Sequence, residues 1–193
     1  GIATVISLGA RIDGNNYSSS QSNPLEQFSP RLAITKNLNE YFSINASAGI
    51  FYQMPTYTIL GYKNNEGNFV NKDVKYIRNQ QAVAGLEYIT DNNARITLEG
   101  YYKIYDNYPF NLVDSISIAN EGSDFGVVGD VPVDNRSKGR SYGIELLIQQ
   151  KLYKDFYALL AYTYGTSEFT NLNNSYTASS SDFRHTLSFT AGK

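Results

Sequence analysis

The sequence contains no cysteine and no tryptophan, and it has one methionine and one histidine among its 193 residues. Without cysteine there is no disulfide framework and no thiolate metal site. A single histidine leaves no second imidazole to complete a zinc site of His and Cys ligands. A net charge of -2 at pH 7 provides no basic face for nucleic acid. These absences exclude several classes of protein, but they fit any cellular compartment.

Long apolar runs are also absent, because no segment approaches the roughly 18 consecutive apolar residues of a transmembrane helix. The first residues, GIATVISLGARID, lack the charged start of a signal peptide and resemble a strand already under way. The last residues, TLSFTAGK, also resemble part of a strand. We therefore expect a segment of a longer mature protein.

Aromatic and turn-forming residues are abundant: there are 17 Tyr, 10 Phe and 15 Gly, with much Asn and Ser. Aromatic residues suit the pleated surface of a strand, whereas Asn, Gly and Ser favour turns. Alternation of apolar and polar residues predicts eight strands, at 2–12, 29–36, 41–53, 80–89, 94–106, 140–151, 156–168 and 184–192. The sequence therefore predicts an all-β protein with one antiparallel up-and-down domain over residues 1–193.

Short and long connections alternate along the chain. The expected tight turns are 37–40, 90–93 and 152–155, and the long connections are 13–28, 54–79, 107–139 and 169–183. In an up-and-down sheet every second connection lies at the same end, so all the long loops would collect at one rim. Transmembrane β-barrels of the bacterial outer membrane have this asymmetry, and a soluble barrel has no need of it. We therefore predict a transmembrane β-barrel.

The two parities of the predicted strands differ in polarity. In ARITLEGYYKIYD (94–106), one parity is apolar and the other carries Arg95, Glu99 and Lys103. The polar parity has few large aliphatic side chains and would make a poor soluble core. No charge falls in the middle of an apolar parity, where it would cost about 2–4 kcal/mol at the bilayer midplane. We predict that the apolar parity faces lipid and that the polar parity lines a wet interior, with opposite charges neutralising each other along 94–106. The residues predicted to face this interior are Arg95, Glu99, Lys103, Glu145 and Arg184.

The long connections carry aromatic side chains that offer stacking surfaces to a ligand. Because long external loops in barrels are often functional, we expect ligand capture there. The residues concerned are Tyr57, Tyr62 and Tyr76 in 54–79, and Tyr108 and Phe110 in 107–139.

Three features of the sequence are candidate sites of chemistry. His185 lies near Asp182 and Arg184, but its parity places it on the apolar side, so we interpret it as an interfacial residue and predict no catalytic group. The acidic residues of 107–139 suggest either a cation site or, as we prefer, a solvated loop; they are Asp114, Glu121, Asp124, Asp130 and Asp134. The basic residues of 54–79 leave open an anionic ligand, lipopolysaccharide or a contact with the acidic loop; they are Lys63, Lys72, Lys75 and Arg78. No metal or cofactor is predicted.

Five stretches together resemble the C-terminal barrel of TonB-dependent outer-membrane receptors, in particular the type found in Bacteroides-like bacteria. They are FSPRLAIT (28–35), GIFYQMP (49–55), GRSYGIELLIQQKL (139–152), YTYGTSEF (162–169) and DFRHTLS (182–188). The resemblance implies about eight strands of a 22-stranded-type barrel, whose plug domain and remaining strands lie outside this chain. It also implies non-enzymatic, TonB-dependent uptake of a siderophore, cofactor, glycan or peptide. The implied partners are outer-membrane lipid, the receptor's own plug docked on the polar face, TonB acting through that plug, and a surface lipoprotein.

Two alternatives remain open from the sequence. One is a complete eight-stranded outer-membrane barrel with a structural or adhesive role, which the chain length would also fit. The other is a soluble ligand-binding β-barrel in which the apolar parity forms the core. Large side chains on the polar parity, including Phe51, Tyr101 and Tyr157, would crowd the interior of an eight-stranded barrel and favour the larger receptor.

Overall fold

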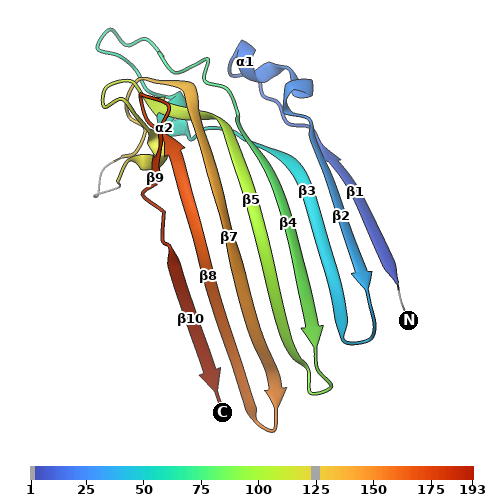
Figure 1. The fold of residues 1–193 in the computed structure, drawn as a ribbon. Coiled ribbons are helices and arrows are strands. Elements are labelled where there is room, and N and C mark those ends of the chain that lie inside the picture. The colour runs from blue at the N-terminus through green and yellow to red at the C-terminus, as the bar shows by residue number, and fades with distance from the viewer. Residues whose placement is uncertain (1–2, 123–126) are drawn as a thin grey trace.

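A computed structural model describes residues 3–122 and 127–193. It contains one antiparallel sheet whose eight principal strands lie side by side in chain order (Figure 1). These strands are β1 (Thr4–Arg11), β2 (Ser29–Asn37), β3 (Phe42–Gln53), β4 (Ile77–Ile89), β5 (Ala94–Asn111), β7 (Val133–Tyr153), β8 (Phe156–Thr170) and β10 (His185–Gly192). The predicted all-β, up-and-down architecture is confirmed. β1 and β10 lie at opposite edges and do not pair, so the sheet is open and the alternative of a closed eight-stranded barrel is wrong for this chain.

Short strands and helices lie within the long connections. β6 (Ile116–Ser117) pairs with β5, and β9 (Tyr176–Ala178) pairs with β8. Four short helices, which the sequence analysis did not predict, are α1 (Ser19–Ser22), η1 (Pro24–Gln27), α2 (Tyr57–Leu60) and η2 (Ile118–Asn120). None of the helices in the described residues has the length and apolar character needed to cross a membrane.

Tight turns join the strands at one end of the sheet, where the sequence placed them. In the turn between β2 and β3, Asn39 Oδ1 accepts hydrogen bonds from the backbone N–H groups of Tyr41 and Phe42, at 2.9 and 2.8 Å. Between β7 and β8, Lys154 and Asp155 have φ values of 48° and 63°. Positive φ at both central residues is typical of the type I′ hairpin, whose twist matches that of the strands.

Three of the four long connections are shorter than predicted, and the third along the chain differs most. β5 and β7 continue to pair as far as Asn111 and Val133, so the predicted loop 107–139 shrinks to 112–132. Register shifts on either side of Tyr108 mark β-bulges in this extension. Alternation of polar and apolar residues does not predict this extension, because loops cover it and side chains of either parity are buried there. Phe110 and Asn111 are each 1% exposed.

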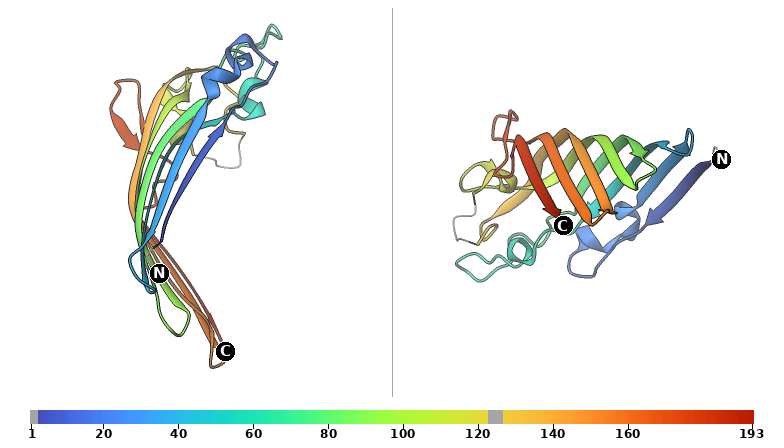
Figure 2. Two further views of the ribbon diagram at one scale, coloured as in Figure 1. Left: turned by 90° about the vertical axis from the view of Figure 1, so that its right-hand side faces the viewer. Right: turned by 90° about the horizontal axis from the view of Figure 1, so that it is seen from below.

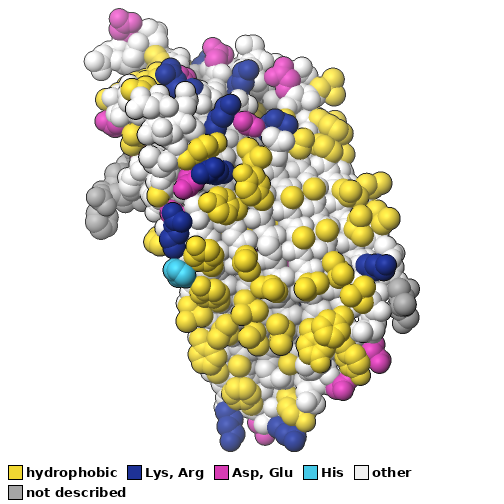
Figure 3. Space-filling view, viewed as in Figure 1, with side chains coloured by type: hydrophobic (Ala, Val, Ile, Leu, Met, Phe, Trp, Pro, Cys, Tyr) yellow, Lys and Arg dark blue, Asp and Glu magenta, His cyan; other side chains and the backbone are white. Residues whose placement is uncertain are grey.

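The strand register gives the sheet two chemically different faces. The apolar face includes the transverse row Ile34, Ala46, Ala84, Gly100, Ile144 and Tyr164. The polar face includes the adjacent row Thr35, Asn45, Gly85, Glu99, Glu145 and Thr163. In Figure 3 hydrophobic side chains spread over the apolar face, and charged side chains gather mainly toward its two ends. The sheet itself is twisted and curved (Figure 2).

The buried apolar cluster of the described residues lies among the loops and not within the sheet. It consists of Ile59, Leu60, Val74, Ile118 and Val133, and we call it the loop core. The apolar side chains of the sheet remain exposed, because no second layer covers their face. The long loops therefore form a packed cap at one end of the sheet, and the connections 12–28 and 54–76 bend over its polar face (Figure 2).

A buried amide side chain fastens the loops to one another. Asn71, which is 1% exposed, donates hydrogen bonds to the carbonyl oxygens of Ile59 and Val131, at 2.9 and 2.8 Å. Its Oδ1 accepts a hydrogen bond from the backbone N–H of Val133 at 2.9 Å. One side chain thus satisfies three backbone groups around the loop core.

We predict that Asn71→Ala loosens the loop cap and leaves the strands paired. Each buried backbone group that loses its partner costs about 1–3 kcal/mol. Limited proteolysis of the full-length protein in outer-membrane vesicles should cut the loops several-fold faster than in the unmodified protein. Asn65→Ala, at an exposed loop position, serves as the control. Equal cleavage rates in the two variants would contradict this role for Asn71.

Candidate functional site

A cavity of about 1280 Å³ lies at the loop end of the polar face. We call it the loop cavity. Strands β1, β3, β4, β5 and β8 form one part of its wall, and all four long connections supply the rest. Seven aromatic residues in its lining are Phe51, Tyr52, Tyr57, Tyr76, Tyr105, Tyr108 and Phe169. The cavity therefore lies where a barrel of this topology would open at its loop rim.

Three of these aromatic residues form a packed cluster on β5 and β8. The ring centroids of Tyr108 and Phe169 are 4.5 Å apart, those of Tyr105 and Phe169 are 5.4 Å apart, and Tyr105 meets Tyr108 edge-on at 6.3 Å. Phe169 lies over Gly139, where an added Cβ would come within 2.3 Å of the ring. Burial raises the pKa of the Tyr108 phenol, which lies in the extension of β5 beyond the apolar band, so it stays protonated and uncharged.

Charged groups are few in the loop cavity. Arg11 donates from Nε and Nη2 to Asp13 Oδ1, at 2.8 and 2.6 Å, so its charge is compensated. Glu121 is the other charged residue of the lining and accepts a hydrogen bond from Asn111 Nδ2. One arginine and two carboxylates give the lining a net charge of -1.

The structure brings together three of the five aromatic residues that the sequence predicted for ligand capture. Tyr57, at the start of α2, is 78% exposed, and Tyr76 is buried with its hydroxyl oxygen accepting from Asn15 Nδ2 at 3.1 Å. Tyr108 also lines the loop cavity, but Tyr62 and Phe110 do not. Tyr108 and Phe110 belong to β5 and not to a loop tip, because pairing with β7 extends that far.

The strand-borne aromatic residues of the cavity were not predicted as ligand contacts. They are Phe51 and Tyr52 near the end of β3, Tyr105 in β5 and Phe169 near the end of β8. A signal for two of them was present in the sequence, because Phe51 and Tyr105 fall on the polar parity at the loop end of their strands. An aromatic side chain at such a position has no lipid contact and is available to the interior.

Four of the five residues predicted to face the interior lie on the polar face: Arg95, Glu99, Lys103 and Glu145. Their ion pairing differs from the prediction. Arg95 forms its salt bridge with Glu87 of β4 and not with Glu99, because the neighbouring strand lies closer than the next charge along β5. The Lys103 ammonium lies 4.9 Å from the centroid of the Tyr101 ring. Neither Glu99 nor Lys103 forms a salt bridge with another described residue.

Glu99 and Glu145 lie directly opposite each other on β5 and β7. Both line a small cavity of about 230 Å³, together with Thr97. Thr97 is 7% exposed, and its Oγ1 has no hydrogen-bond partner among the described residues. Arg95 also lines this recess, but it is paired with Glu87. The recess therefore holds two adjacent carboxylates that form no salt bridge with a described residue, and one unpaired hydroxyl.

Arg184 does not enter the polar face, contrary to the prediction. Its Nε donates to Asp182 Oδ2 at 3.0 Å, and its Nη1 donates to Thr166 Oγ1 at 3.1 Å. Thr166 pairs with Tyr142 in a row of the apolar face. Strand parity does not apply to Arg184, because the residue precedes the first pair of β10.

His185 lies on the apolar face, where its Nδ1 is 2.8 Å from the Tyr162 hydroxyl. The neighbouring Asp182 is engaged elsewhere, by Arg184 and by the backbone N–H of Ser167. Among residues 3–122 and 127–193, no three His, Asp or Glu side chains are arranged to hold a metal ion. Of the predicted acidic residues, Asp124 lies outside the described residues.

The basic and acidic loops do not meet through ion pairs. Within the described part of the chain, no salt bridge joins 54–79 to 107–139. Arg78 pairs instead with Asp106 of β5, at 3.6 Å. Instead, the hydrogen bonds of Asn71 and the apolar contacts of the loop core join the two loops.

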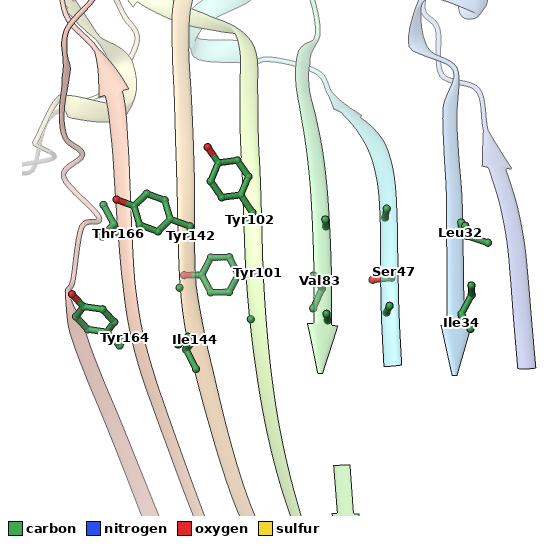
Figure 4. A pocket seen from close by; sticks show the side chains of 16 residues that line it. Leu32, Ile34, Ser47, Val83, Tyr101, Tyr102, Tyr142, Ile144, Tyr164 and Thr166 are labelled. Atoms are coloured by element: carbon green, nitrogen blue, oxygen red, sulfur yellow. The ribbon is translucent and has the colours of Figure 1, made fainter. Parts of the chain in front are cut away.

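A groove of about 740 Å³ runs along the apolar face (Figure 4). Its floor consists of small residues, including Ala46, Ala84 and Gly100. One wall carries Leu32, and the other carries Tyr102 and Tyr142, whose rings stack at 5.9 Å. Nearly all of its lining atoms are apolar, so this groove suits contact with hydrocarbon and not capture of a polar ligand.

Comparisons with known proteins agree with this geometry. Residues 4–192 match the family described as TonB dependent receptor-like, beta-barrel. The pyoverdine outer-membrane receptor FpvA of Pseudomonas aeruginosa is 15% identical, with a TM-score of 0.65 over 97% of this chain and 26% of FpvA. The ferric-catecholate import receptor Fiu of Escherichia coli is 12% identical, with a TM-score of 0.61 over 98% of this chain and 29% of Fiu. The siderophore receptor PirA of P. aeruginosa is 17% identical, with a TM-score of 0.59 over 86% of this chain and 32% of PirA.

A search of curated protein sequences finds no match to the chain. At these identities the structural likeness shows the fold alone, and the chain spans 26–32% of the length of these three receptors. The match over residues 4–192, by contrast, covers nearly the whole sequence. The chain therefore belongs to the TonB-dependent receptor-like β-barrel family of the bacterial outer membrane.

Proposed function

We propose that this chain forms part of the wall of an outer-membrane receptor that takes up a nutrient by TonB-dependent transport, without enzymatic activity. The observation that carries the proposal is the family match over residues 4–192. In this arrangement the apolar face contacts lipid, the polar face lines the interior, and the loop cavity is the external mouth. Tyr57, Tyr76 and Tyr108 contact the ligand there, whereas Tyr62 and Phe110 support the loops.

The open edges of the sheet support a larger barrel. β1 and β10 each pair with one neighbouring strand, so one row of backbone N–H and C=O groups on each lacks a partner in the described sheet. In hydrocarbon each unpaired group costs several kcal/mol, and only a closed barrel avoids this cost. We therefore propose that residues 1–193 are a contiguous part of a barrel domain completed by further strands.

The recess between Glu99 and Glu145 supports contact with a plug domain. Two carboxylates that face each other, neither of them in a salt bridge with a described residue, favour a guanidinium or ammonium group brought by another segment. A plug inside the barrel would place such a group against the polar face, and TonB would act through that plug. The surface lipoprotein and the Bacteroides-like subtype remain predictions from the sequence.

The proposed function is tested by binding between the full-length receptor and the periplasmic domain of TonB from the same bacterium. Fractionation should place the receptor in the outer membrane, and the purified protein should retain the TonB domain on a column. A version that lacks its N-terminal TonB-contacting segment should not retain it. Absence of retention by the intact receptor would show that the proposed function is wrong.

We predict that Ile144→Arg destabilises the barrel by about 2–4 kcal/mol, because it places a cation in hydrocarbon. Ile144 is 52% exposed on the apolar face. Glu145→Arg, one residue further along β7, points to the wet interior and should change the free energy of unfolding much less. Urea unfolding of the full-length receptor in lipid vesicles measures both. Equal destabilisation would contradict the assignment of the two faces.

We also predict that Glu99→Lys combined with Glu145→Lys loosens the plug, because both carboxylates that attract its cation are replaced by like charges. Cells that make the full-length variant should admit a large antibiotic, such as vancomycin, several-fold faster than cells with the unmodified receptor. Glu40→Lys combined with Glu66→Lys, at two exposed positions outside the strands, provides the charge-matched control. Unchanged entry in the double variant would argue against this contact.

A further inference from the structure

The electrostatics of the loop cavity disfavour an anionic ligand. Its lining has a net charge of -1, and its one cation, Arg11, is already paired with Asp13 at 2.6 Å. Two other cations of the polar face, Arg31 and Lys103, lie against the rings of Phe51 and Tyr101, at 4.4 and 4.9 Å, and do not belong to the lining. Proteins hold anionic groups with free guanidinium or ammonium groups, and the described residues of this lining offer none.

The aromatic residues of the cavity offer ring faces to a ligand. The cluster of Tyr105, Tyr108 and Phe169 is packed and therefore fixed in orientation. Tyr57 on α2 and Phe51 on β3 contribute rings from other parts of the lining. A rigid aromatic wall binds a flat apolar surface with little loss of side-chain entropy.

Neutral polar groups surround these rings. Asn15, Gln53, Ser167 and Ser181 contribute amide and hydroxyl groups to the lining. Asp13 Oδ2 and Asn79 Oδ1, which also belong to lining residues, are buried without a hydrogen-bond partner in the described structure. A ligand hydroxyl that reached these acceptors would satisfy them without bringing negative charge next to Asp13.

We propose that the loop cavity binds an uncharged oligosaccharide, whose sugar rings stack on the Tyr105, Tyr108 and Phe169 cluster and whose hydroxyl groups bond to the surrounding amides, serines and Asp13. A sugar ring combines an apolar face with a rim of hydroxyl groups, and the cavity offers aromatic faces edged by neutral polar groups. This inference rests on the proposed function, because it names the substrate class of the same cavity. An anionic ferric catecholate complex would meet the uncompensated carboxylate of Glu121 here.

Calorimetry on the full-length receptor tests the proposal with defined probes. The neutral probes are hexasaccharides of glucose, mannose and galactose, in α- and β-linked forms, and the anionic probe is ferric enterobactin. We expect saturable binding of at least one hexasaccharide and none of ferric enterobactin. Binding of ferric enterobactin alone, or of none of the probes, would overturn the proposed substrate class.

Variants then locate the bound sugar. Tyr105→Ala should weaken hexasaccharide binding at least tenfold, because it removes a ring from the cluster, and Tyr105→Phe should retain most of the affinity. Tyr102→Ala changes the same strand on its apolar face and should have no effect. Equal affinity in the Tyr105→Ala and Tyr102→Ala variants would overturn the assignment to this cavity.

A charge variant separates neutral from anionic recognition. Glu121→Gln removes the carboxylate of the lining that forms no salt bridge with a described residue, and it leaves the Arg11–Asp13 pair intact. Hexasaccharide affinity should change by less than tenfold and ferric enterobactin should still not bind, whereas a gain of ferric enterobactin binding at the expense of the sugar would contradict the proposal. Retention of the TonB domain is measured on the same samples. If TonB binds but no hexasaccharide does, the substrate class alone is wrong, and if TonB does not bind, the proposed function itself fails.

Discussion

The register between neighbouring strands is the constraint on which the rest of the structure depends. Side chains alternate between the two faces of a strand, so a slip of one residue would move every polar-face charge of that strand to the apolar face. The turns hold this register locally: Asn39 Oδ1 caps two backbone N–H groups at one hairpin, and Lys154 and Asp155 set the twist of another. The ladder between β5 and β7 continues this register across the sheet, so Glu99 and Glu145 lie opposite each other on the polar face.

A single sheet with no second layer packed along either face cannot contain a core of its own, which explains where the buried residues lie. The loop core forms at the rim, where β5 and β7 extend beyond the apolar band and loops cover both sides of the strands. Asn71 is central there because loop backbone, unlike strand backbone, has no ladder to satisfy it. The loop cavity is thus bounded by a packed structure and not by freely moving segments.

The strands, the turns and the two faces were predictable from sequence, because each depends on residues that are near one another in the chain. The interactions at the rim were not. Asn71 bonds to Val131, 60 residues away, and no periodic pattern encodes that contact. Arg95 forms its salt bridge with Glu87 on the neighbouring strand. Arg184 lies off the polar face because it precedes the first residue pair of β10. Alternation predicts which face a residue occupies within a strand, but it is silent about partners and about strand ends.

The bulge in β5 is the place where the loop cavity departs from the alternation of side chains that orders the rest of the sheet. Tyr105 and Tyr108 are three residues apart, so a regular strand would place them on opposite faces. Asn107, with a φ of 56°, adopts the left-handed conformation at the register shift, and both tyrosines then meet Phe169 on one wall of the cavity. Asn tolerates this conformation better than most residues, and its carbonyl oxygen accepts a hydrogen bond from Asn135 at 3.1 Å. A single extra residue thus converts two opposed side chains into one aromatic surface, beyond the point where the membrane requires strict alternation.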